Sequence, residues 1–108
     1  MLSGYRIMWL LVMFDLPVTS KKQQKAATTF RNHLLDEGFQ MAQFSVYMRF
    51  TYGKESAEAY CKRVQQALPR WGKVSILTIT DKQYERMICF YGGAAEPAKK
   101  NPEQLLLF

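Results

Sequence analysis

The 108-residue sequence has few of the side chains that build common catalytic and metal sites. It contains one histidine, His33, and two cysteines, Cys61 and Cys89, whose separation does not match metal-ligand spacing. It has no glycine-rich phosphate loop, no Ser-His-Asp set and no CxxC pair. These absences argue against a zinc site and a disulfide framework. We expect both cysteines to be reduced, buried small hydrophobes, and we expect no catalytic role for the lone His33.

Long hydrophobic runs are also missing. The longest run near the start, Ile7 to Phe14, has eight residues and ends at Asp15, whereas a bilayer-spanning helix needs about 20. The run does not have the pattern of a cleavable signal sequence either. We therefore expect a cytoplasmic protein that does not associate with membranes.

Acidic residues are scarce: nine Asp and Glu stand against 15 Lys and Arg, which gives a net charge of +6. The 48% of hydrophobic residues excludes wholesale disorder. A single domain of this length buries a limited share of its surface, and forming a homo-oligomer would increase that share. Residues 1–91 hold 13 basic and 7 acidic residues, so the excess charge lies in the part expected to fold. The phosphate backbone of a nucleic-acid duplex is the obvious acidic partner, bound by contacts that are independent of sequence and sensitive to salt.

Hydrophobic periodicity, capping signals and turn residues divide the chain into alternating strands and helices. Ser20 and Gln23 form a capping box ahead of the first helix, and Asp81 with Lys82 is expected to form a turn between two strands. The expected elements are a strand at Arg6–Phe14, a helix at Lys21–Glu37, strands at Phe39–Met41 and Phe44–Thr51, a helix from Lys54 that Pro69 ends, and strands at Lys73–Thr80 and Tyr84–Tyr91.

This order predicts an α+β, ferredoxin-like βαββαβ fold with an additional C-terminal strand, in which both helices cover one face of an antiparallel sheet. Gly92 and Gly93 are expected to close the folded domain, residues 1–92. Residues 93–108 contain two prolines and show no periodicity, so we expect a flexible tail that ends in an apolar peptide. Since this fold hosts many functions, it settles none of them.

Asp15 is the first candidate functional residue because a carboxylate directly follows a buried strand. It could hold a metal ion, or it could hydrogen-bond to backbone amides in the turn that contains Leu16 and Pro17. A magnesium site usually takes one or two protein carboxylates plus waters and substrate phosphates. A two-fold dimer would supply a second carboxylate.

The first predicted helix is the second candidate, because four basic residues precede its first acidic residue. They are Lys21, Lys22, Lys25 and Arg31. Further basic residues, among them Arg49, add to the excess elsewhere. A solvated helix face remains the alternative to a phosphate-binding face.

A non-catalytic module that binds single-stranded RNA has the same order of elements. Such modules stack bases on strand aromatics, and Phe44, Tyr47 and Phe50 occupy the third expected strand. The glycine-bearing aromatic signature of those modules is missing. A small-molecule regulatory or enzyme domain of the same fold is a further alternative, weakened by the charge and by the lack of a convergent polar set.

Five segments together resemble a known family. They are Val12 to Asp15 at the end of the first strand, the basic stretch Lys21 to Arg31, Gly38, the run Gln43 to Tyr47, and the turn Leu77 to Tyr84. These match the small CRISPR-associated endoribonuclease, the dimeric subunit of the spacer-acquisition complex, over about residues 5 to 92.

The resemblance implies a homodimer that binds double-stranded DNA and bridges two dimers of the CRISPR integrase. It also implies a Mg²⁺-dependent nuclease in which two copies of Asp15 hold one ion. Arg49 and the lysines of the first helix would contact phosphates. Many relatives have an acidic residue after the aromatic that corresponds to Tyr47, whereas this sequence continues with Met48 and Arg49.

The C-terminal peptide resembles a second recognition element. Gln104, Leu105, Leu107 and Phe108 match the Gln-Leu-x-Leu-Phe pattern that partners of the bacterial sliding clamp insert into its hydrophobic pocket. Alternatively, the tail adds a strand to its own subunit or to the sister subunit and covers a sheet edge.

Overall fold

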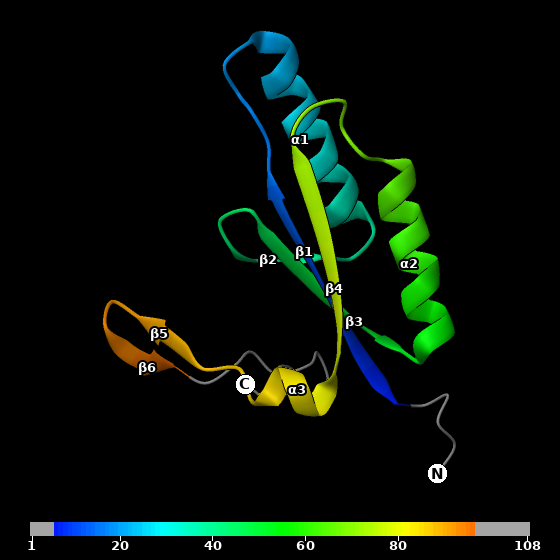
Figure 1. Ribbon diagram of the computed structural model, residues 1–108, viewed down its shortest axis with the longest axis vertical. Helices are drawn as coiled ribbons and strands as arrows, with labels where there is room; N and C mark the ends of the chain where they lie inside the picture. The colour runs from blue at the N-terminus through cyan, green and yellow to red at the C-terminus, as the bar shows by residue number, and fades with distance from the viewer. Residues whose placement is uncertain (1–5, 97–108) are drawn as a thin grey trace.

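The computed structural model describes residues 6–96 (Figure 1). Four strands form one antiparallel sheet, two long helices pack on it, and a short helix and a two-stranded hairpin follow. The elements are β1 (Ile7–Asp15), α1 (Lys21–Asp36), β2 (Gln40–Gln43), β3 (Val46–Tyr52), α2 (Lys54–Gln66), β4 (Lys73–Thr80), α3 (Asp81–Glu85), β5 (Cys89–Tyr91) and β6 (Ala94–Glu96).

The sheet has the strand order β2-β3-β1-β4, with every neighbouring pair antiparallel. Strands β1 and β2, which α1 connects in sequence, are therefore not neighbours in the sheet, because β3 lies between them. This is the ferredoxin-like arrangement, and the α+β class predicted from the sequence is confirmed. The central strand β1 pairs with β3 from Ile7 to Met13 and with β4 from Met8 to Asp15.

Helix α1 begins and ends where its local sequence predicts. The Ser20 side chain accepts a hydrogen bond from the Gln23 backbone N–H, and the Gln23 side chain accepts one from Ser20, so the capping box forms. Gly38 has a φ of +86° just beyond the helix, a conformation that favours glycine. The helix turns Ala27, Phe30 and Leu34 inward at helical spacing.

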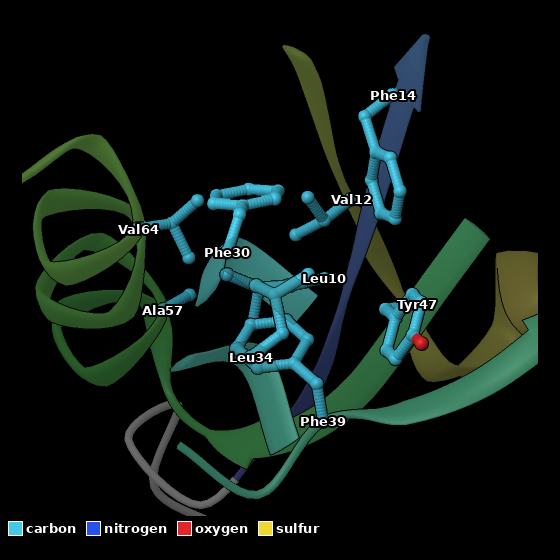
Figure 2. Close-up of a cluster of buried hydrophobic side chains, with 9 residues drawn as sticks. All are labelled: Leu10, Val12, Phe14, Phe30, Leu34, Phe39, Tyr47, Ala57 and Val64. Atoms are coloured by element: carbon cyan, nitrogen blue, oxygen red, sulfur yellow. The ribbon is translucent and has the colours of Figure 1, made fainter. Parts of the chain in front are cut away.

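One side of the sheet carries the main core. Leu10, Val12 and Phe14 alternate along β1 and face α1 and α2, which confirms that both helices cover the same face. Figure 2 shows these side chains meeting Phe30 and Val64 from the two helices. Burying each such side chain contributes about 1.5–3 kcal/mol, so this layer supplies most of the stabilisation of the fold.

The opposite face of the sheet is covered only in part. The intervening residues of β1 point there, and Trp9 stacks on Tyr84 of α3 with 3.9 Å between ring centroids. The indole N–H of Trp9 also donates a hydrogen bond of 2.7 Å to Asp81 at the start of α3. A smaller cluster around Trp9, Met48 and Tyr84 results. Helix α3 thus closes one end of this face.

The strand expected at Tyr84–Tyr91 is wrong in its extent and its partner. Residues 81–85 are helical, because Thr80 caps the backbone N–H of Gln83 and the Gln83 side chain accepts from Thr80 in return. The segment expected as a turn, Asp81 with Lys82, is the start of that helix. The additional strand is present only as Cys89–Tyr91, which pairs with β6 and not with the four-stranded sheet.

Gly92 and Gly93 form the turn between β5 and β6, both with positive φ. Residues 94–96 were expected to belong to the flexible tail, but they form strand β6, which pairs with β5. The remainder of that tail lies outside the described residues. The division into a domain at 1–92 and a tail at 93–108 stays a prediction.

Candidate functional site

Asp15 lies at the exposed end of β1. Leu10, Val12 and Phe14 face the helices, so the alternation of the strand places Asp15 on the opposite face of the sheet. Within residues 6–96 its carboxylate makes no hydrogen bond and no ion pair, and the turn role considered above is therefore not seen. An exposed carboxylate without a partner is available to bind a cation or a substrate.

The strand beside Asp15 brings a positive charge to the same place. Asp15 pairs with Lys73 in the register of β1 and β4. Paired residues of antiparallel strands project from the same face, with their Cβ atoms about 4.5–5.5 Å apart. Lys73 is exposed, and the described part of the chain gives it no ion-pair partner. Asp15 and Lys73 are therefore neighbours on the same face of the sheet, at the end of β1 and the start of β4.

Gly72 holds the backbone of Asp15 in place. A Cβ atom at Gly72 would lie 2.5 Å from the Asp15 carbonyl oxygen and 2.9 Å from Cδ2 of Leu16, and Gly72 has a φ of +88°. Only glycine permits both this conformation and this approach. The sequence analysis did not single out Gly72, since its contact with Asp15 comes from the packing of the α2–β4 connection against the end of β1.

The turn between β2 and β3 lies on the other side of Asp15. The backbone N–H of Phe14 donates a 2.9 Å hydrogen bond to the carbonyl oxygen of Ser45. Ser45 has a φ of +62°, which is uncommon for a residue with a side chain. Phe44, at the tip of this turn, is 91% exposed. Figure 1 shows the turn beside the end of β1.

Asp15 is the candidate metal ligand of this site, and no cluster of ligands surrounds it in the described chain. Residues 6–96 contain no group of three His, Cys, Asp or Glu side chains close enough to hold a metal ion. Asp15 fits as one oxygen ligand of Mg²⁺, an ion that takes few protein carboxylates and keeps waters or substrate phosphates. His33 has its Nε2 buried without a hydrogen-bond partner in the described region and lies on α1, next to the core residue Leu34.

Helix α1 presents its lysines to solvent. Lys21, Lys22 and Lys25 are exposed, and the first turn of the helix has no acidic residue. Arg31 is half-buried and donates a 3.2 Å hydrogen bond to the Thr28 hydroxyl. Three cations near a helix N-terminus are unfavourable for the helix dipole, which favours anions there. The structure therefore places the three lysines on the first two turns of α1, while Arg31 lies further along the helix and contacts Thr28.

Arg49 is engaged within the fold. Its guanidinium lies 3.9 Å from the ring centroid of Tyr60 and donates hydrogen bonds to the backbone carbonyls of Phe50 and Glu37. Arg63, on the same aromatic ring, pairs with the Glu37 carboxylate. These contacts join α1, β3 and α2. A contact between Arg49 and nucleic acid stays a prediction.

The three aromatics considered for base stacking have different surroundings. Tyr47 is buried among the core side chains beneath the helices, with its ring near Phe14. Phe50 is half-buried beside Trp9 on the other face, at 5.9 Å between centroids. Phe44 alone of the three is exposed. A platform of adjacent stacking aromatics on β3 is therefore not formed.

Apolar side chains remain exposed on the face and hairpin that the helices do not cover. Leu77 on β4 is 48% exposed, and larger fractions are exposed for Ile88, Phe90 and Tyr91 in and beside β5. In Figure 1 the β5–β6 hairpin lies to one side of the four-stranded sheet, beyond α3. The exposed apolar side chains gathered in and beside β5 indicate an interaction with another protein surface.

Other features of the described chain add little to this site. A groove of about 1030 Å³ near the start of α2 is lined by Arg6 and Lys54 but also by Glu55 and Glu58, so neither charge dominates it. Cys61 and Cys89 are free and half-buried. No helix within residues 6–96 is long and apolar enough to cross a membrane. The terminal peptide proposed to dock on a clamp, Gln104 to Phe108, lies outside the described residues.

Sequence comparisons agree with this geometry. The family model for "CRISPR associated protein Cas2" matches residues 8–87. The chain is 58% identical over 108 residues to a protein of Paracidovorax avenae, covering the full length of both. It is 47% identical over 107 residues to one of Flavobacterium psychrophilum, covering 99% of this chain and 93% of the relative. It is 44% identical over 101 residues to one of Parvibaculum lavamentivorans, covering 94% and 100%. Each relative is named CRISPR-associated endoribonuclease Cas2. The chain therefore belongs to the CRISPR-associated Cas2 family.

Proposed function

We propose that this protein is a homodimeric subunit for CRISPR spacer acquisition with a Mg²⁺-dependent nuclease site at Asp15. The observation that carries the nuclease proposal is the exposed Asp15 carboxylate, which has no partner among residues 6–96 and lies beside Lys73. The relatives are named endoribonucleases, which supports phosphodiester cleavage as the reaction. RNA or DNA would be the substrate.

The uncovered sheet face supports the homodimer. Trp9 and α3 cover one end of that face, whereas Leu77 and the β5 residues Phe90 and Tyr91 stay exposed. A second copy of the chain offers the same apolar surface, so a two-fold contact would bury both. Because Asp15 lies on this face, the contact can also bring the two carboxylates toward each other.

The proposed Mg²⁺ site uses one carboxylate from each subunit. Asp15 would contribute oxygen ligands, and water and a substrate phosphate would supply the others. When bound, the ion would activate a water for attack on phosphorus and stabilise the charge that develops on the phosphate oxygens. Lys73, in register with Asp15, can hold a neighbouring phosphate by charge attraction.

The exposed lysines support binding to double-stranded DNA. Lys21, Lys22 and Lys25 lie on the first two turns of α1. The helix dipole stabilises a bound anion at this end and is unfavourable for cations that have no anion beside them. A duplex that crosses this helix would supply that anion through its phosphates. Two copies of the helix in a homodimer would extend the basic surface and allow it to bridge two integrase dimers.

Replacing Asp15 tests the nuclease proposal directly. Asp15→Asn keeps the size of the side chain and removes its charge, so Mg²⁺-dependent cleavage of RNA and DNA oligonucleotides should fall at least about 100-fold. Asp36→Asn is a matched control, because Asp36 is exposed on the last turn of α1. Cleavage by Asp15→Asn at the parental rate would refute the assignment. Sedimentation at one protein concentration should show that both variants still dimerise.

Reconstitution tests the role in adaptation. The full chain is combined with the integrase, a short DNA duplex and a plasmid that carries a repeat, and new insertions are counted. We expect insertion to depend on this chain and to persist with Asp15→Asn, since bridging needs no cleavage. Equal insertion without the chain would overturn the bridging role.

A non-catalytic module for single-stranded RNA is the weaker candidate. It requires several exposed aromatics on one sheet face, and Tyr47 is buried while Phe50 packs beside Trp9. Preference for duplex DNA over single-stranded RNA in a binding titration, with a steep salt dependence, would distinguish the two candidates.

A further inference from the structure

Phe44 is the large hydrophobic side chain of the β2–β3 turn, and it has an unusual position. It is 91% exposed. Burial of a phenylalanine side chain would stabilise the folded state by about 1.5–3 kcal/mol, and a chain of this length has only a small hydrophobic core. None of the aromatic ring contacts found within residues 6–96 involves it. Its exposure is therefore not compensated by packing within the described chain.

The backbone holds Phe44 close to Asp15. The hydrogen bond from Phe14 N–H to the Ser45 carbonyl joins the residue before Asp15 to the residue after Phe44. Bond lengths on each side limit the separation of the Phe44 and Asp15 Cα atoms to about 14 Å. A few nucleotides of single strand can span this distance.

Ser45, the residue after Phe44, has an uncommon backbone conformation. Its φ of +62° places a residue with a side chain in the left-handed region. The carbonyl of this residue is fixed to β1 by the Phe14 hydrogen bond. The anchored backbone beneath Phe44 reduces the backbone freedom that is lost when a flat ligand stacks on its ring.

We propose that Phe44 stacks on the base of an unpaired nucleotide whose strand passes Asp15, and that it selects which phosphate is cleaved. This inference rests on the proposed nuclease function and adds a specificity-determining residue to it. Lys73 lies on the strand beside Asp15 and can hold a phosphate of the same strand. Base stacking on an aromatic side chain tolerates every base, so Phe44 would favour unpaired over paired nucleotides and not a particular sequence.

Fluorescence of 2-aminopurine measures the stacking without requiring cleavage. Ten-nucleotide RNA and DNA single strands, each with one 2-aminopurine at a varied position, are titrated with the full chain without Mg²⁺ at low salt. The parent and Phe44→Trp should quench the fluorescence. Phe44→Ala should lose the quenching and bind about 5- to 150-fold more weakly. Leu35→Ala is the control, since Leu35 is 50% exposed near the end of α1.

Cleavage patterns then test the selection of the phosphate. An abasic nucleotide placed at each position in turn should slow cleavage by the parent at one position relative to the cut, and Phe44→Ala should lose this dependence. Equal quenching and affinity for Phe44→Ala and the parent would overturn the proposal, as would failure of the parent to bind either strand.

A Phe44→Ala protein that no longer dimerises would also overturn the proposal by assigning Phe44 to a subunit contact. The nuclease function fails by a different result, namely parental cleavage by Asp15→Asn, and that result leaves the quenching measurement valid.

Discussion

Gly72→Ala tests whether the α2–β4 connection fixes the position of Asp15. The added Cβ would lie 2.5 Å from the Asp15 carbonyl oxygen, a backbone atom that cannot move independently of β1. The φ of +88° adds a left-handed penalty of about 1–2 kcal/mol. Crowding of this kind costs about 1–3 kcal/mol. The expected loss of unfolding free energy is about 2–5 kcal/mol.

The control is Gly93→Ala. Gly93 has a φ of +87°, close to that of Gly72, but a Cβ there meets no atom within 4 Å. The conformational penalty is therefore shared, and the crowding is specific to Gly72. We expect the two variants to differ by about 1–3 kcal/mol, which is the crowding contribution.

Urea denaturation followed by tryptophan fluorescence measures both variants, at one fixed protein concentration because dimerisation would make stability depend on concentration. The thermal midpoint of Gly72→Ala should fall by roughly 8–20 °C. Movement of the Asp15 backbone should also slow cleavage, since a displacement of 1 Å at a reacting group can cost about 100-fold in rate. Equal unfolding free energies for Gly72→Ala and Gly93→Ala would refute the close-contact argument.

Two further outcomes follow from the surface of the chain. Replacing Lys22 and Lys25 with Gln should weaken the binding of duplex DNA of any sequence. The slope of log K against log salt should fall in magnitude by about 1 per lysine. Lys62→Gln on α2 is the control and should leave that slope unchanged, because the proposed contact is on α1. For the C-terminal peptide, residues 103–108 should bind the bacterial sliding clamp and Phe108→Ala should abolish binding; no binding at high micromolar peptide would favour the alternative in which the tail covers a sheet edge.

The sequence predicted those parts of the fold in which local signals agree with packing. The capping box at Ser20 and Gln23 and the glycine at Gly38 set both ends of α1. Aromatic and β-branched residues favour a strand at Tyr84–Tyr91, but the capping interactions of Thr80 start a helix that includes Tyr84. Thr80 and Gln83 repeat the spacing of Ser20 and Gln23, and this second capping box was the available signal for α3.

The candidate site could be predicted only in part. Asp15 was found because a carboxylate ends an apolar strand, a pattern visible in one sequence. Its lack of a partner, its register with Lys73 and the approach of Gly72 depend on β4 and the preceding loop, which are distant in sequence. For Arg49, its positive charge alone predicted a contact with phosphate. The stacking of its guanidinium on Tyr60 arises from tertiary packing, which one sequence does not reveal.

In the proposed homodimer, the position of Asp15 couples metal binding to subunit association. Two symmetry-related carboxylates on facing apolar surfaces repel each other, and covering them without a cation costs free energy. A Mg²⁺ ion shared between them removes that repulsion, so the ion should bind the dimer more tightly than the monomer and strengthen the dimer by the same factor. In this arrangement the partner would supply the second carboxylate, and the shared site would need no further acidic residue from residues 6–96.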